Sequence, residues 1–358
     1  MGASIYSTPF GVTVILGAGT LLLLFLLKTM GSVIAPILFT FTLAVTVAPF
    51  IKRLERRGMG HGLAVAAVFL GAFCVAAVIL AIIVGQLTVF TERIPQYQAI
   101  LSQNLAPVIA RAQELGIAKD TFASGTPLSP DALARAGLQF ARSILAQLGT
   151  FAVFLFLMLV MAAEGPAVGR TLETHVPPHS PLVIRYRAFL HEVQAQYRIA
   201  TLSNSVSAVA LTIAYLAFRI DFALLWGLLT FFLSYIPRFG MLVSFIPPVL
   251  MALVLHGPST ALSVLLLAFA INIVMDNVIT PRLTGKGLSL RLSVVAIAAI
   301  VWLWVFGALG AILSVSLMLF IRMILASSPQ TLPLAYALST ESYAPPDVTP
   351  EPEAKAPK

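Results

Sequence analysis

Long apolar runs separated by short polar stretches make up most of the chain. A transmembrane helix needs ~20 mainly apolar residues, and most of the runs approach or exceed that length. The pattern therefore predicts an all-α integral membrane protein with about eight membrane segments. The runs cover approximately residues 10–27, 32–51, 62–84, 143–163, 206–218, 222–236, 241–255, 261–280 and 292–326.

The runs in the C-terminal half are interrupted. The run 222–236 is too short to cross a bilayer straight, and the next run, 241–255, carries two adjacent prolines. Irregular backbone is tolerated at membrane depth where it lines a cavity, so we predict broken or re-entrant helices here. One broken element over 222–255 would give eight segments and a cytoplasmic tail, whereas two elements would give nine and an external tail. The helix-break residues are Pro237, Gly240, Pro281 and Gly285.

The polar stretches divide the chain into parts. The insert after the third run has apolar residues three or four apart, which is typical of a helix with one apolar face. It is either a packing element or a cap that captures substrate. The predicted parts are N-terminal membrane helices (1–86), an external helical insert (87–145), a membrane helix (146–163), a cytoplasmic amphipathic helical segment (164–204), a C-terminal membrane region with broken helices (205–326) and a disordered tail (327–358).

Composition and charge exclude several classes of protein. The chain has 358 residues, of which 59% are hydrophobic and 10% charged, and a soluble domain carries about 25% charged residues. The formal net charge is +8, but the basic residues lie mostly between apolar runs, so we expect no nucleic-acid partner. The basic cluster at 52–57 is cytoplasmic by the positive-inside rule, which places the N-terminus in the cytoplasm. The single cysteine, Cys74, excludes an intramolecular disulfide framework and a Cys-rich metal site.

A few polar side chains lie within the apolar part of the chain. Ionised groups at mid-membrane are costly and mark functional sites by default. Asp276 is the clearest case; it could pair with Arg282 in a buried ion pair that fixes helix packing, or it could bind a cation or take up a proton. The candidates for a transport path or an ion site are Asp276, Asn272, Asn277, Arg238 and Arg282.

The sequence offers little for catalysis. Each of the five histidines lies at a segment edge or in a polar stretch, so no Ser–His pair at membrane depth is predicted. Only one carboxylate lies clearly at depth, and no GxxxxGK phosphate loop occurs. We predict no enzyme, no catalytic residue, no metal and no cofactor. A membrane transporter is expected, and a non-transporting membrane scaffold is the alternative.

Three segments carry a family resemblance. SYIPRFGMLVSFIPPVLMAL (234–253) resembles the IPxxG break and proline-bearing helix of the autoinducer-2 exporter family of bacterial membrane permeases. DNVITPRLTGKGLSLRLSVV (276–295) resembles that family's PxxxG segment, and GALGAILSVSLM (307–318) resembles its final helix. The order of spans and inserts is also similar over about residues 10–326.

The resemblance implies a multi-pass permease of the bacterial inner membrane. It implies export of a small polar solute such as autoinducer-2, or sodium/proton antiport as in other branches, and assembly as a homo-oligomer, with a pentamer expected. Pro237, Gly240, Pro281 and Gly285 match the breaks that shape the family's translocation region. Two residues depart from the family pattern: Arg238 stands where an aromatic residue is more usual, and Arg291 where a histidine is common.

Overall fold

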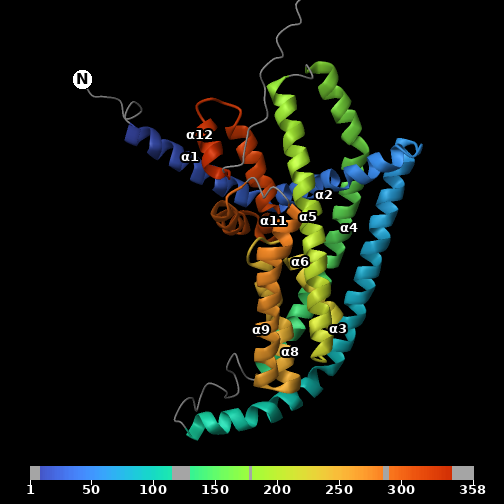
Figure 1. Cartoon of the computed structure of the whole chain (residues 1–358), viewed down its shortest axis with the longest axis vertical. Helices are drawn as coiled ribbons and strands as arrows, with labels where there is room; N and C mark the ends of the chain where they lie inside the picture. Colours follow the sequence, from blue (N-terminus) through green and yellow to red (C-terminus); the bar gives the residue numbers. More distant parts are fainter. Residues whose placement is uncertain (1–8, 115–129, 177–179, 285–289, 341–358) are drawn as a thin grey trace, which may run out of the picture. The chain divides into compact units, whose positions relative to one another are not determined.

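The computed structural model describes residues 9–114, 130–176, 180–284 and 290–340. Every regular element in these ranges is a helix, and the one β pairing among them is an isolated bridge between Leu290 and Ser339 (Figure 1). The helices are α1 (Pro9–Thr29), α2 (Gly31–Glu55), α3 (His61–Glu114), α4 (Pro130–His175), α5 (Pro181–Ala217), α6 (Ala223–Leu233), α7 (Gly240–Ser244), α8 (Ile246–His256), α9 (Pro258–Val274), the π-helical turn η2 (Met275–Ile279), α10 (Thr280–Thr284), α11 (Leu292–Leu325) and α12 (Leu332–Leu338).

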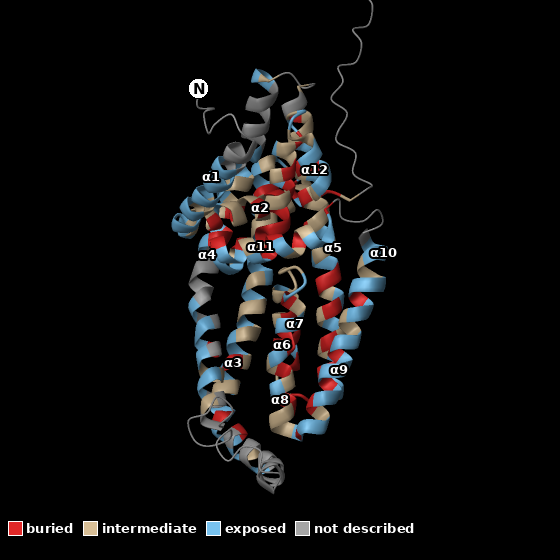
Figure 2. Cartoon of the chain, turned by 90° about the vertical axis from the view of Figure 1, so that its left-hand side faces the viewer, coloured by how far each residue is buried: buried red, intermediate tan, exposed pale blue. Residues whose placement is uncertain are grey.

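Five stretches of helix in the described part are long and apolar enough to cross a membrane. They are Gly31–Glu55, His61–Tyr97, Val183–Ala217, Pro258–Leu283 and Leu292–Leu325. Many large apolar side chains on these helices are exposed, and α3 is almost entirely exposed or intermediate in Figure 2. Apolar surface of this extent is stable in lipid and not in water. The all-α membrane fold expected from the sequence is confirmed.

The chain forms two compact units, which we describe separately. Unit 1 comprises Met1–Ala48, Val160–Gln194 and Leu288–Lys358, and unit 2 comprises Pro49–Leu159 and Ala195–Gly287. Three continuous helices, α2, α4 and α5, contribute residues to both units. Helix α3 continues past residue 86, where the sequence analysis divided span from insert.

In unit 2, helices α6, α7 and α8 form a hairpin. Helix α6 ends at Leu233, the chain turns, and α7 and α8 return alongside, with Thr230 Oγ1 lying 3.0 Å from Ser244 Oγ in the buried interior. At the open end of the hairpin, His256 Nε2 lies 3.3 Å from the carbonyl oxygen of Arg219. The end of α8 therefore lies beside the end of α5, on the side where the hairpin began.

Apolar side chains fill the part of this hairpin that lies away from its tip. Helix α8 packs against α3 and α9. The core includes Tyr215, Trp226 and Met251, each at most 5% exposed. The loop before α6 is held by Asp221, whose carboxylate accepts a 2.8 Å hydrogen bond from Tyr97 and whose carbonyl accepts one from Trp226 Nε1.

In unit 1, α11 is sharply bent. Gly307 has φ 66° and ψ −151°, a backbone region that is essentially restricted to glycine. Arg291, at the start of α11, donates from its backbone N–H to Leu338 and from Nε to the carbonyl of Ser339, at 2.8 Å. A straight helix of 34 residues would be ~51 Å long. The short segment between Leu325 and Ser339, which includes α12, could not lead back over that distance to Arg291. Both ends of α11 therefore lie close together.

The prediction of a disordered tail from residue 327 is wrong for residues 327–340. This stretch contains α12, and Ala335 and Ser339 are 0% and 1% exposed. The apolar segment LPLAYAL forms helix α12 and packs on α11. The burial of its apolar side chains compensates for the conformational entropy lost on ordering. Residues 341–358, the rest of the predicted tail, lie outside the described part of the chain.

Candidate functional site

The tip of the α6–α8 hairpin is the first part of the site. Residues 234–239 form the turn, and Arg238 has a positive φ of 70°. Gly240 starts the return helix so close to α6 that an added Cβ would lie 1.7 Å from the carbonyl oxygen of Leu233. Only glycine permits this contact. Arg238 lies in this turn, two residues before the close contact.

The second part of the site is an irregular turn at the end of α9. Residues Met275–Ile279 form one π-helical turn, a feature that occurs frequently at functional sites. The turn alters the four-residue spacing by which Asn272 and Asp276 would share one helix face. Asn277 donates from its side-chain amide to the carbonyl of Ile273 at 2.8 Å. The amide therefore satisfies the backbone at the irregular turn.

Arg238 and Asp276 meet between these two elements. Arg238 Nη1 lies 3.6 Å from Asp276 Oδ2, and the two side chains are 40% and 43% exposed. Both residues lie ~25–30 Å along their helices from the turn at Gly257, given a rise of ~1.5 Å per residue. Two helix interruptions far apart in sequence therefore bring one cation and one carboxylate together, without sealing them in the interior.

Helix α5 contributes a row of hydroxyl and amide groups to the same region. Ser203 Oγ lies 2.8 Å from Thr280 Oγ1, and Thr201 Oγ1 lies 2.7 Å from the hydroxyl of Tyr235 in the hairpin turn. Tyr235 also stacks on Tyr197, with 6.2 Å between ring centroids. The sequence analysis did not select these residues. The sequence signal was the run TLSNSVS at 201–207. It belongs to the apolar stretch Val183–Ala217, which is long enough to cross a membrane.

One buried hydroxyl in the hairpin turn has capacity left for a hydrogen bond. Within the described residues, the Ser234 Oγ atom is buried and has no hydrogen-bond partner. Buried polar groups are normally satisfied by protein or by water. Ser234 is adjacent to Tyr235, so this hydroxyl adds a further polar group to the site.

The structure places the other predicted site residues as follows. Asn272 is half-buried on α9, Arg282 is exposed on α10, and the ion pair of Asp276 is formed with Arg238 instead of Arg282. Pro237 directly precedes Arg238 in the hairpin turn, and Pro281 lies in α10. Gly285 lies outside the described residues.

The site consists of hydrogen-bonding groups around one ion pair. No group of three or more His, Cys, Asp or Glu residues that could hold a metal ion occurs among the residues searched, which are those that the structure describes. The available chemistry is therefore hydrogen bonding by hydroxyls, an amide, a carboxylate and a guanidinium. Such groups recognise a polar, uncharged solute or a single small cation.

Comparison with known proteins identifies the kind of molecule. A model of the AI-2E family transporters matches residues 13–330. A putative transport protein of Haemophilus influenzae is 27% identical over 324 residues, covering 88% of this chain and 92% of that protein. The AI-2 transport protein TqsA of Escherichia coli is 26% identical over 338 residues, covering 92% and 96% of the two chains. The putative transport protein YhhT of Escherichia coli is 34% identical over 98 residues, 27% of this chain and 28% of that protein.

These names point to transport and not to catalysis. The family match extends over α2 to α11 and so includes both helix interruptions and the α5 polar row. The chain is a multi-pass membrane protein that belongs to the AI-2E transporter family.

Proposed function

We propose that this protein exports a small polar solute such as autoinducer-2 across the bacterial inner membrane, with its N-terminus in the cytoplasm. The observation that carries the proposal is the Arg238–Asp276 pair, which lies at two helix interruptions and retains about 40% exposure on both side chains. Half-helix ends and unwound backbone are used for substrate binding in transporters. A hydroxylated solute would find donors and acceptors on all three sides of this site.

The packing of unit 2 suggests how passage is controlled. The polar groups lie near the tip of the α6–α8 hairpin, whereas the rest of the hairpin is closed by apolar packing around Tyr215, Trp226 and Met251. A solute at the tip would therefore reach the other side only if the hairpin moved relative to α3 and α9. Rocking or gating of one element against another around a fixed site is the general pattern of alternating access. Assembly as a homo-oligomer, with five copies expected from the resemblance, belongs to the same proposal.

Transport in proteoliposomes tests the proposal. Vesicles with purified protein are loaded with labelled autoinducer-2, and its efflux is compared with that from protein-free vesicles. Arg238→Gln and Asp276→Asn each remove a charged group that would hydrogen-bond the solute, an interaction worth about 1.5–3 kcal/mol, so efflux should slow about tenfold or more. Arg57→Gln and Glu164→Gln change exposed charges outside the site and should leave efflux unchanged.

Two results would contradict the proposal. Wild-type protein that moves no solute above the protein-free background, although it is folded, would favour the scaffold alternative. Efflux that is equally fast in all four variants would move the path away from Arg238 and Asp276.

Sodium/proton antiport is a second candidate function. Asp276 favours it, because a partly exposed carboxylate at a π-helical turn can exchange a proton or a sodium ion if Arg238 moves away. A sodium gradient should then change the internal pH of proteoliposomes, and Asp276→Asn should abolish that change. Undiminished gradient coupling in Asp276→Asn would exclude Asp276 as the ion carrier.

A further inference from the structure

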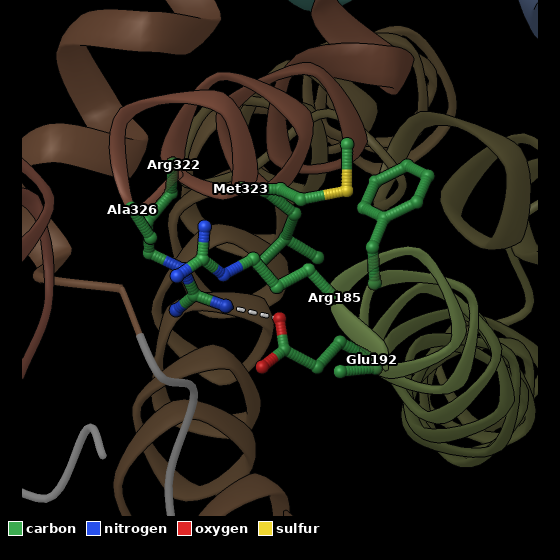
Figure 3. Close-up of a pocket in the computed structure, with 8 residues that line it drawn as sticks. Arg185, Glu192, Arg322, Met323 and Ala326 are labelled. Atoms are coloured by element: carbon green, nitrogen blue, oxygen red, sulfur yellow. Dashed lines mark hydrogen bonds and ion pairs between the residues drawn. The ribbon is translucent and has the colours of Figure 1, made fainter. Parts of the chain in front are cut away.

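A second charged site lies in unit 1, between α5 and the C-terminal part of α11. Eight residues line a pocket there, and Figure 3 shows Arg322 joined to Glu192, with the guanidinium of Arg185 beside that of Arg322. The lining also includes the apolar residues Phe189, Leu319 and Met323. The proposed transport path, which lies in unit 2, uses none of them.

Among the described residues that line this pocket, positive charges outnumber negative ones. Arg322 has a side chain that is only 3% exposed, and it forms an ion pair with Glu192. Arg185 brings a second guanidinium to the same pocket, and its buried Nε atom has no hydrogen-bond partner among the described residues. The described lining of the pocket thus holds two guanidinium groups and one carboxylate. This excess of positive charge favours an additional anion.

The shape and lining of the pocket limit the anion to a compact group. The cavity is small, about 20 Å³. The planar guanidinium fork matches the oxygens of phosphate and carboxylate groups. Phe189, Leu319 and Met323 supply apolar surface beside the charges, where carbon atoms attached to the anion could pack.

The position of the pocket indicates which anions would meet it. Arg322 lies in the last turn of α11, and Arg185 lies near the first residue of the apolar stretch Val183–Ala217. A stretch of 35 residues is longer than one crossing of the bilayer core needs, so its first turn reaches the interface or the water beyond it, where lipid phosphates and dissolved phosphates are available. We propose that Arg185 and Arg322 form a binding site for a phosphate group, with Glu192 orienting Arg322.

Binding measurements on the full-length protein in uncharged detergent test this site. One arm adds inorganic phosphate at constant ionic strength, with chloride as the balancing salt. The other arm adds short-chain phosphatidylglycerol, with phosphatidylcholine as the uncharged comparison. Ligand that binds only the folded protein raises its Tm, so the Tm shift gives an apparent Kd in each arm.

Arg185→Gln is the decisive variant, and Arg187→Gln is its matched control. Arg187 is on the same helix but is exposed and does not line the pocket. Loss of a charge-assisted hydrogen bond should weaken binding about tenfold in Arg185→Gln, with no change in Arg187→Gln. Without added anion, Arg185→Gln should be at least as stable as the wild type, because it relieves repulsion with Arg322. Arg185→Lys keeps the charge without the fork and should bind with intermediate affinity, which keeps the test valid if Arg185→Gln does not fold.

The two arms identify the source of the phosphate group. A Tm shift with phosphatidylglycerol alone would assign the site to a lipid headgroup, and a shift with inorganic phosphate would assign it to a dissolved phosphate. The proposal is overturned if neither ligand shifts the wild-type Tm, or if Arg185→Gln and Arg187→Gln respond alike. Because the measurement is binding at equilibrium and not flux, its failure would leave the transport proposal untouched.

Discussion

Arg238 and Asp276 differ from an ordinary buried ion pair in their exposure. A buried pair that loses one partner costs about 3–5 kcal/mol because the other charge is left uncompensated. A pair in contact with water contributes only about 0.2–1 kcal/mol. With 40% and 43% of the side chains exposed, the pair belongs to the second kind if the surroundings of the hairpin tip are wet. The coupling free energy between Arg238 and Asp276 therefore indicates whether the site is hydrated, as a transport path must be.

A double-mutant cycle on this pair makes that measurement. Arg238→Gln, Asp276→Asn and the double variant are compared with wild-type protein by thermal unfolding in detergent. We expect a coupling free energy of about 1 kcal/mol or less, as measured for solvent-exposed pairs. A coupling well above about 2 kcal/mol would mean that the pair is dry and fixes helix packing, and the tip of the hairpin would then be a structural element instead of a path.

At the scale of helices, the hairpin depends on the close approach of α6 and α7. An added methyl at Gly240 would collide with the Leu233 carbonyl, a backbone atom that cannot rotate away. Forcing extra atoms into a packed site costs about 1–3 kcal/mol. Gly71 provides a matched control, because a Cβ there meets nothing within 4 Å on α3.

We therefore expect Gly240→Ala to lower the Tm and to reduce transport together, since it moves Arg238 away from Asp276. Gly71→Ala should be neutral or slightly stabilising, as alanine favours helix over glycine. Thermal unfolding and solute efflux on the same preparations check both effects. Equal Tm values for the two variants would show that the approach of α6 and α7 is looser than the structure indicates.

The sequence predicts the helices of this fold better than the contacts between them. The apolar run 32–51 lies within α2, and the run 241–255 corresponds to α7 and α8, because hydrophobic length and proline position are local properties. The contact of Arg238 with Asp276 could not be read in the same way. It depends on the return of a hairpin and on a π-helical turn, and both are set by tertiary packing. Arg282, only six positions away from Asp276, was the more obvious partner in sequence.

The α5 polar row shows a different limit. Ser, Thr and Asn at 201–207 lower the local hydrophobicity, so the sequence analysis ended its cytoplasmic segment at residue 204 and began the membrane region after it. In the structure one helix continues from Pro181 to Ala217. Hydroxyl groups within a helix can bond to the carbonyl four residues earlier, and Ser205 and Ser207 do so. A polar run inside a membrane helix is therefore compatible with continuous helix.

At the scale of the whole chain, the α6–α8 hairpin and α11 each end on the same side of the membrane as they begin. The α6–α8 hairpin starts and ends beside Arg219, and α11 bends at Gly307 so that its end approaches its start. Neither element would then change the side of the membrane on which the chain continues. With the N-terminus in the cytoplasm, as proposed above, a cytoplasmic tail is expected, which is one of the two alternatives that the sequence left open. This geometry also favours a cytoplasmic position for Arg282, Arg291 and Arg322, as the positive-inside rule expects.

Cysteine labelling in intact cells tests this topology. Cys74 lies within the α3 span, so Cys74→Ser provides a background without other thiols. Ser342→Cys, placed just after the described part of the chain, should react with a membrane-impermeant maleimide only after the cells are permeabilised. Ser124→Cys, in the insert, should react in intact cells and serves as the external control. The contrary outcome is that Ser342→Cys reacts as readily as Ser124→Cys in intact cells. In that case either the α6–α8 hairpin or α11 would have to cross the bilayer, and the hairpin could no longer be assigned as a re-entrant segment.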